Sequence, residues 1–278
     1  MIIVGVDGSR AGLEAVGWAA REAALRDTPL LVAHAIPAWA CEPATGRYAE
    51  VAAWMREGGQ SVLNTAEERA RRERPGIAVS GRLLPGDPRA ALIGAAGEAE
   101  LMVIGSHGLG GVRGLLLGSV AYGVAGHAAC DVVVVRELPS RPRAEVVVGV
   151  DGSAHSDRVL SSAFAEAELR GAELRAVHAW NWPWEGDPRF AGDEPEYEPL
   201  SLTDILASHR ARHPSVNVTE ESVHDHPIRA LRQAATGADL LVVGSRGHGT
   251  FAGLLIGSVS QALLHESPCP LMVIRSAT

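Results

Sequence analysis

The chain has 278 residues, and all 25 of its Lys and Arg residues are arginines, because the sequence contains no lysine. This excludes protein classes that need a lysine amine: the P-loop of the G-x-x-x-x-G-K-[ST] type, pyridoxal phosphate enzymes and Schiff-base aldolases. A net charge of −8 without a basic block argues against nucleic acid and anionic membrane as partners, so we expect small molecules or other proteins.

The cysteines and the apolar segments indicate where the protein works. Cys41, Cys130 and Cys269 are odd in number and lack C-x-x-C spacing, which argues against a disulfide framework or a zinc ribbon. No apolar stretch approaches the roughly 20 residues that cross a bilayer, and no signal-peptide pattern is visible at the start. We therefore expect a cytoplasmic protein.

The chain repeats itself. The segment Ile2–Ser9 (IIVGVDGS) returns 144 positions later as Val146–Ser153 (VVVGVDGS), and Val103–Gly108 returns at an offset of 139 as Val242–Gly247. Residues 137–143 contain two prolines and read as a linker. These repeats predict two domains, at residues 1–137 and 144–278.

In each half, short β-branched runs alternate with helical patterns. Continuous apolar runs are typical of strands buried on both faces, and intervening helices indicate parallel βαβ units. The predicted strands are 2–6, 30–36, 77–84, 101–104 and 132–135 in the first half, and 146–150, 173–179, 216–223, 240–243 and 271–274 in the second. Helices are expected to begin near Ser9 and Ser156, with apolar residues at intervals of three and four.

Glycine-rich loops follow the fourth predicted strand of each half. Each loop has the pattern G-x-x-G, a spacer of nine residues and then Gly-Ser. In the first half the pattern runs from Gly105-x-x-Gly108 to Gly118-Ser119, and in the second from Gly244-x-x-Gly247 to Gly257-Ser258. We expect glycines with positive φ to form an anion-binding nest, followed by a helix start whose free N–H groups favour phosphate. The alternative, that these glycines only make tight turns, stays open. The loop is not a dinucleotide fingerprint, because it follows the fourth strand and Arg113 stands where the third glycine would be.

The chain resembles the ATP-binding class of universal stress proteins. The resemblance rests on three motifs: an Asp after the first strand, G-x-x-G-x9-G-[ST] after the fourth, and Gly-Ser-Val opening the last helix. It covers nearly the whole chain, because these motifs occur once in each half. The resemblance implies an α/β fold of two Rossmann-like domains, each a five-stranded parallel sheet of order 3-2-1-4-5 flanked by helices. It places nucleotide at the carboxyl edge of each sheet. It also suggests that the last strands pair the two halves.

The resemblance also assigns site residues. Asp7 and Asp151 would lie beside the nucleotide, with Gly5 and Gly149 just before them, although an Asp-Gly-Ser turn is the alternative reading for the aspartates. Ala35 and Ala179 would meet the adenine through their backbone. The ribose and phosphates would be held in the first half by Ile104, Gly105, Ser106, His107, Gly108, Gly110, Gly118, Ser119 and Val120. In the second half the same roles would fall to Val243, Gly244, Ser245, Arg246, Gly247, Gly249, Gly257, Ser258 and Val259.

The second half departs from this pattern in its loops, because Arg246 replaces His107 and Ala252 stands where the first half has Arg113. His224-Asp225-His226 replaces the Gly86-Asp87 of the first half, and it is the one local histidine cluster, but no third metal ligand can be identified. His34 and His178 are expected to pack against a helix, and Cys130 and Cys269 to pack in the core. Trp180, Trp182 and Trp184 precede an acidic stretch ending at Glu198, which we interpret as a lid, a docking loop or a partly ordered connection.

The expected function is binding of ATP, with Mg as the accompanying cation, one molecule per half, in a nucleotide-responsive regulator of stress or growth. No catalytic residue and no resident metal are predicted. The chain lacks a lysine, a Walker-B pattern and a residue that orients water. A slow ATPase or autophosphorylating enzyme of the same fold stays open, as does a nucleotide-free interaction module. The expected partners are a second copy of the chain, through last-strand or domain contacts, and a regulatory protein that the sequence does not identify.

Overall fold

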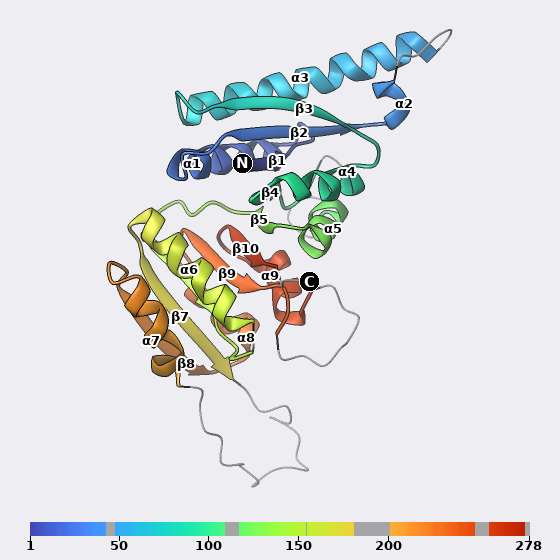
Figure 1. The fold of residues 1–278 in the computed structure, drawn as a ribbon. Helices are drawn as coiled ribbons and strands as arrows, with labels where there is room; N and C mark the ends of the chain where they lie inside the picture. Colours follow the sequence, from blue (N-terminus) through green and yellow to red (C-terminus); the bar gives the residue numbers. More distant parts are fainter. Residues whose placement is uncertain (43–47, 109–116, 154, 181–200, 248–255, 276–278) are drawn as a thin grey trace, which may run out of the picture. The chain divides into compact units, whose positions relative to one another are not determined.

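The computed structural model describes residues 1–42, 48–108, 117–153, 155–180, 201–247 and 256–275, and the chain forms two compact units (Figure 1). The first unit consists of Met1–Leu138 together with Pro270–Thr278, and the second of Pro139–Cys269. No helix of the described segments is long and apolar enough to cross a membrane. The first unit thus includes the last strand of the chain, so the units do not follow the two repeats strictly. The domain boundaries at 137 and 144, which were drawn from the repeats, stay predictions.

The first unit is built on a sheet in the order β3-β2-β1-β4-β5, the predicted 3-2-1-4-5, with every pair parallel. Its strands are β1 (Ile2–Gly5), β2 (Leu30–Ile36), β3 (Val79–Pro85), β4 (Leu101–Gly105) and β5 (Asp131–Val135). The central strands are buried along their length, whereas β3 is largely exposed because it lies at the edge. β10 (Leu271–Ile274) pairs antiparallel with β5, so the last strands of the two repeats meet as expected.

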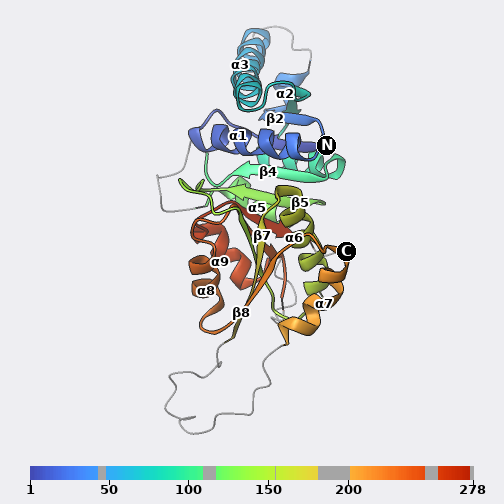
Figure 2. The same ribbon diagram turned by 90° about the vertical axis from the view of Figure 1, so that its left-hand side faces the viewer.

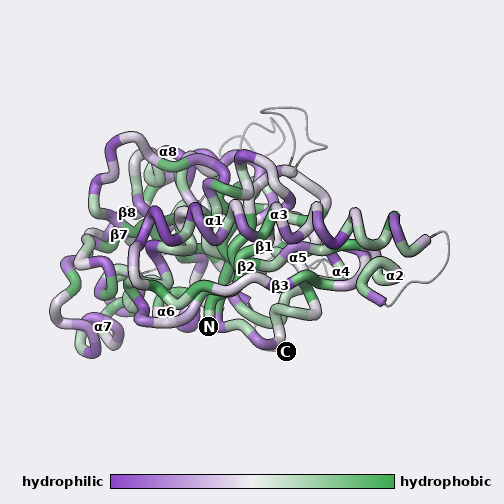
Figure 3. Tube along the Cα trace, turned by 90° about the horizontal axis from the view of Figure 1, so that it is seen from above, coloured by the Kyte–Doolittle hydropathy of each residue, from purple (hydrophilic) through white to green (hydrophobic). Residues whose placement is uncertain are grey.

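Helices cover both faces of this sheet. They are α1 (Arg10–Leu25), α2 (Ala38–Cys41), α3 (Ala49–Glu73), α4 (Pro88–Ala95) and α5 (Ser119–His127), with a 3-10 turn η2 at Ala96–Glu98. α1 packs against α3, and α4 packs against α5. Figure 2 shows α1 and α3 beside one another, and Figure 3 shows apolar β1 and β2 beneath the polar turns of α3. The buried strands and the inward helix faces together form the core.

The second unit repeats the scheme with the parallel order β9-β6-β7-β8. Its elements are β6 (Glu145–Gly149), α6 (Ser156–Arg170), β7 (Glu173–Trp180), α7 (Leu202–Arg212), β8 (Val218–His224), α8 (Pro227–Ala234), β9 (Leu240–Gly244) and α9 (Ser258–Glu266). α6 packs against α7, and α8 against α9, as in the first unit. All ten predicted strands are present, and their ends shift by no more than two residues, as where 77–84 becomes Val79–Pro85.

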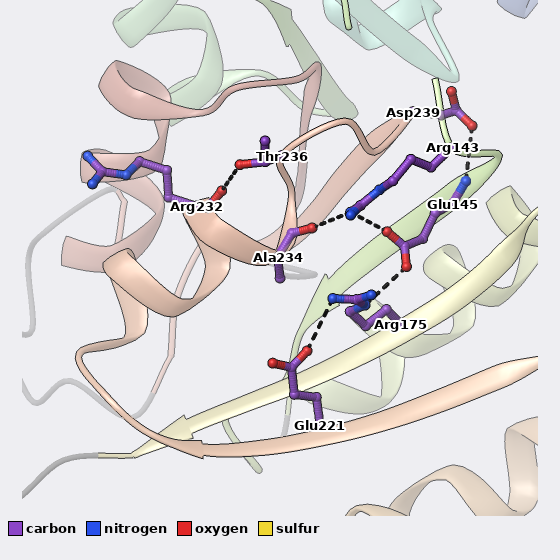
Figure 4. Close-up of polar contacts among 8 residues, drawn as sticks. All are labelled: Arg143, Glu145, Arg175, Glu221, Arg232, Ala234, Thr236 and Asp239. Atoms are coloured by element: carbon purple, nitrogen blue, oxygen red, sulfur yellow. Dashed lines mark hydrogen bonds and ion pairs between the residues drawn. The ribbon is translucent and has the colours of Figure 1, made fainter. Parts of the chain in front are cut away.

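A charge network fixes the beginning of β6 (Figure 4). The carboxylate of Glu145 accepts from Arg143 Nη2 at 2.5 Å and from Arg175 Nε at 3.0 Å, and Arg143 also donates to the carbonyl of Ala234 at 2.7 Å. Asp239, just before β9, accepts from the Glu145 backbone N–H at 3.1 Å. Burial raises the pKa of the Asp239 carboxyl. These contacts hold the amino ends of β6, β7 and β9 in register.

Candidate functional site

The turn after the first strand places an aspartate at the carboxyl edge in each unit. β1 ends at Gly5, and the backbone turns at Gly8, whose φ of +85° favours glycine; Gly152 has the same role with φ +75°. The Ser9 N–H donates to Asp7 Oδ1 at 3.0 Å, and the Ser153 N–H donates to Asp151 Oδ1 at 2.9 Å. Both aspartates therefore act as turn residues, since each accepts a hydrogen bond within its turn, and their contact with nucleotide stays a prediction.

The glycine loops after β4 and β9 approach these aspartates so closely that a side chain would not fit. A Cβ added to Gly108 would lie 2.3 Å from Asp7 Oδ2, and one added to Gly247 would lie 2.3 Å from Asp151 Oδ2. The described glycines of these loops do not have positive φ, so the expectation of positive φ stays a prediction for Gly110 and Gly249, which lie outside the described residues. These glycines make room for a carboxylate, and the left-handed turn belongs to Gly8 and Gly152 instead.

The first glycine of each loop is confined by its neighbours. A Cβ on Gly105 would lie 2.9 Å from the carbonyl carbon and oxygen of Ala11, and one on Gly244 would lie 2.9 Å from the Arg246 carbonyl oxygen. The glycines of β1 and β6 are confined by leucines, because a Cβ on Gly5 would lie 2.8 Å from Leu92 and one on Gly149 would lie 3.0 Å from Leu231. The loop and the strand ends are thus packed as tightly as glycine allows.

The last helix of each repeat begins beside the same loop. The Gly118 N–H donates to the Ser106 carbonyl at 2.8 Å, and the Gly257 N–H donates to the Ser245 carbonyl at 2.7 Å. α5 then starts at Ser119 and Val120, and α9 at Ser258 and Val259, without a side-chain cap on either helix among the described residues. First-turn N–H groups without a side-chain cap, at the positive end of a helix, form an anion-binding arrangement.

The structure thus brings most of the predicted residues to one place in each unit: the aspartate, both glycines of G-x-x-G and the Gly-Ser helix start. Ile104 and Val243 are buried at the strand ends just before them. Ala35 and Ala179 are half-buried in β2 and β7. Gly110, Gly249 and Arg113 lie outside the described residues, as do Trp182, Trp184 and the acidic stretch.

Two predicted loop residues behave differently in the two repeats. In the first, the Ser106 hydroxyl and His107 Nδ1 lie 3.0 Å apart in hydrogen-bond contact. In the second, Arg246 occupies the position of His107 and is exposed. The sequence reasoning missed Ser156, whose hydroxyl donates to Asp151 Oδ1 at 2.9 Å. Aligning the repeats shows only that a serine stands here where the first repeat has Gly12, 144 residues earlier.

The histidines have specific partners. His34 Nδ1 lies 2.8 Å from the carbonyl of Val6, and His178 Nδ1 lies 2.9 Å from that of Val150, so each ring is bonded to the chain leaving the first strand. Packing against a helix therefore describes these residues incompletely. The ring of His224 lies 4.3 Å from that of Trp180.

Asp225, between His224 and His226, has protein partners rather than the free geometry of a metal ligand. Asp225 accepts from Arg229 and from the His226 N–H, and the Arg229 hydrogen bond is the main cause that lowers the Asp225 pKa. No group of three or more potential metal-ligating side chains lies together in the described part of the chain.

Comparisons with known proteins agree with this architecture. The model of the universal stress protein family matches residues 1–136 and again residues 143–275. A universal stress protein of Mycobacterium tuberculosis is 36% identical over 293 residues, spanning 99% of this chain and 97% of its own, and one of Mycolicibacterium smegmatis is 34% identical over 285 residues, spanning 99% and 96%. The crystal structure of a universal stress protein from Archaeoglobus fulgidus superposes with a TM-score of 0.74 at 20% identity and covers 99% of this chain and 98% of its own. With the family domain matched twice along its length, the chain belongs to the universal stress protein family, as a tandem member.

Proposed function

We propose that each repeat binds one molecule of ATP with Mg, and that the protein acts as a nucleotide-responsive regulator of stress or growth. The observation that carries this proposal is the convergence, in both units, of a carboxylate, a loop glycine packed against it and a helix start without a side-chain cap. Gly108 and Gly247 let each loop lie directly against the carboxylate, since an added Cβ would lie 2.3 Å from Oδ2, and the neighbouring N–H groups suit a phosphate tail.

The chain's own residues define what each site could do with ATP. The N–H groups of the helix starts would hold the phosphate oxygens, with the Ser119 and Ser258 hydroxyls as further donors. Asp7 and Asp151 could accept from a ribose hydroxyl or contact Mg held by the phosphates, because a carboxylate beside an anion needs a donor or cation between them. Mg would supply charge neutralisation of the tail. Binding can then shift a conformational equilibrium by its difference in affinity for the two states.

The proposed compartment, homodimer and protein partner rest on other features of the chain. The cysteines form no disulfide, and Cys130 and Cys269 are buried thiols, which supports work in the reducing cytoplasm. β5 is already paired with β4 and β10, so a homodimer would use surfaces other than these last strands. The regulatory partner would be a protein that distinguishes the nucleotide-bound form.

The proposal is tested on the purified full-length chain. Mass spectrometry of released ligands and calorimetry with ATP and Mg should find two nucleotide sites per chain. The double variant Gly108→Ala with Gly247→Ala should lose binding, because each added methyl group displaces the carboxylate. The variant Gly94→Ala is the matched control, since nothing lies within 4 Å of a Cβ there. Absence of nucleotide and of binding heat in the unmodified chain would refute the proposal, and multiple turnover would favour an enzyme of the same fold.

A further inference from the structure

The two sites differ in what holds the aspartate. Asp151 Oδ1 accepts from the Ser153 N–H and from the Ser156 hydroxyl, each at 2.9 Å. In the first repeat the Ser9 N–H makes the equivalent bond to Asp7 at 3.0 Å, but position 12 is glycine and supplies no hydroxyl. A hydroxyl bonded to a carboxylate is a charge-assisted hydrogen bond, which is stronger and more directional than a neutral one.

The helix starts show that this hydroxyl is not used as a cap. In the first repeat the Gly12 N–H donates to Ser9 Oγ at 3.1 Å, so Ser9 caps α1 with its side chain. In the second, the Ser156 N–H donates to the Ser153 carbonyl at 2.9 Å, and α6 has no side-chain cap hydrogen bond. Ser153 Oγ is buried without a hydrogen-bond partner among the described residues. The Ser156 hydroxyl therefore serves Asp151, and α6 begins without the cap that α1 has.

The geometry points to Ser156 as a positioning residue for nucleotide in the second site, a role that the first site lacks. In both sites Oδ2 faces the loop, at 2.3 Å from a Cβ on Gly108 or Gly247, and in the second site the Ser156 hydroxyl adds a further bond that holds the carboxylate in this orientation. The carboxylate is then already oriented before ligand arrives, which reduces the ordering cost of binding. This inference rests on the proposed function, and it makes the two sites inequivalent.

The test isolates the second site by using the Gly108→Ala chain, in which the first site is blocked. Calorimetry with ATP and Mg then compares Ser156 with Ser156→Ala and Ser156→Thr. We expect alanine to weaken the affinity about tenfold, equivalent to about 1.4 kcal/mol. Threonine should restore most of the affinity, because it returns the hydroxyl.

Several outcomes overturn the inference. A purely structural serine would lower the unfolding midpoint of Ser156→Ala and leave its dissociation constant for ATP unchanged at temperatures where the chain is folded. Failure of threonine to restore affinity would also count against the hydroxyl. If the unmodified chain binds no ATP, the proposed function fails and the inference with it. Binding in the unmodified chain with an unaffected alanine variant overturns the inference alone.

The reciprocal change is made in the Gly247→Ala chain, where only the first site remains. A Cβ on Gly12 would lie 3.3 Å from Asp7 Oδ1 and 3.4 Å from Ser9 Oγ, so a serine hydroxyl there can reach the carboxylate. We expect Gly12→Ser to bind ATP several-fold more tightly than Gly12→Ala, which adds the same bulk without the hydroxyl. Equal affinities of these two variants would contradict the positioning role.

Discussion

At the scale of single residues, the charge of Glu145 is compensated by specific partners. Its side chain is 10% exposed and pairs with two arginines. Glu145→Ala leaves both guanidinium groups without this partner, so we expect the free energy of unfolding to fall by about 1–3 kcal/mol. Urea denaturation measures this change.

A matched control lies in the same network. Glu221 is 38% exposed and lies 3.5 Å from Arg175 (Figure 4). Its pair is long and exposed to solvent, so Glu221→Ala should cost less than about 0.5 kcal/mol. Equal losses in the two variants would show that burial of the Glu145 pair is not the source of its contribution.

The cysteines give a second prediction at this scale. Burial raises the pKa of the Cys130 thiol to about 11 and that of Cys269 to about 12, whereas Cys41 is half-buried. Because the thiolate is the reactive form, native protein at pH 8 should be alkylated at Cys41 and remain unmodified at the other two. Mass spectrometry of the alkylated chain checks this pattern. All three thiols should react in urea, and rapid native modification of Cys130 or Cys269 would contradict the burial described.

Among the elements, the contact between α6 and α7 contains a buried histidine. His209 is buried and stacks on Phe164 with the ring centroids 5.5 Å apart. Its Nε2 lies 3.1 Å from Asp157 Oδ1, and its Nδ1 lies 2.9 Å from Arg212 Nη2. Arginine can only donate, so Nδ1 accepts and Nε2 carries the proton that is donated to Asp157. Burial first, and then the charge of Arg212, lowers the pKa of His209 below its ordinary 6.5.

This lowered pKa predicts a loss of stability in acid. As the pH falls below 6.5, the unfolded chain takes up the proton on His209 before the folded chain does, so the free energy of unfolding decreases. His209→Gln removes this proton uptake and should flatten the decrease between pH 7 and pH 5, measured by urea denaturation. The exposed His226 provides the comparison, because a His226→Gln variant that flattens the decrease as much as His209→Gln would show that the burial of His209 is not the cause. A profile of His209→Gln that parallels that of the unmodified chain would refute this assignment.

The elements also show how much the sequence could predict. The strands were predictable because buried parallel strands are continuous apolar runs, as in Val132–Val135, and the repeat marked each of them twice. The aspartates and glycine loops were predictable because their spacing recurs. The reason why position 108 must be glycine was not predictable, since only the folded chain brings Asp7 against it. The bonds of Ser156 and His209 were also missed, because they join turns or helices whose approach leaves no periodic signal.

Across the whole molecule, the repeats share a frame but have diverged in charge at their loops. His107 is bonded to Ser106 in the first loop, whereas Arg246 stands exposed at the same position of the second. Arginine keeps its charge at every physiological pH, so Arg246 brings a permanent positive charge to this position. Each loop contains one arginine, Arg113 in the first and Arg246 in the second, so the loops differ in where this charge lies, and in the second it lies within the G-x-x-G segment.

This difference predicts unequal salt dependence of the two proposed sites. Salt screens exposed charges, so raising NaCl from about 50 to about 500 mM should weaken ATP binding by about threefold more at the second site than at the first. Each site is measured alone by calorimetry, in the Gly247→Ala and Gly108→Ala chains. Arg246→His should reduce the salt dependence of the second site, and His107→Arg should increase that of the first. If exchanging these two residues leaves both dependences as they were, Arg246 does not contact the phosphate tail, and the inequivalence of the sites rests on the aspartate and Ser156.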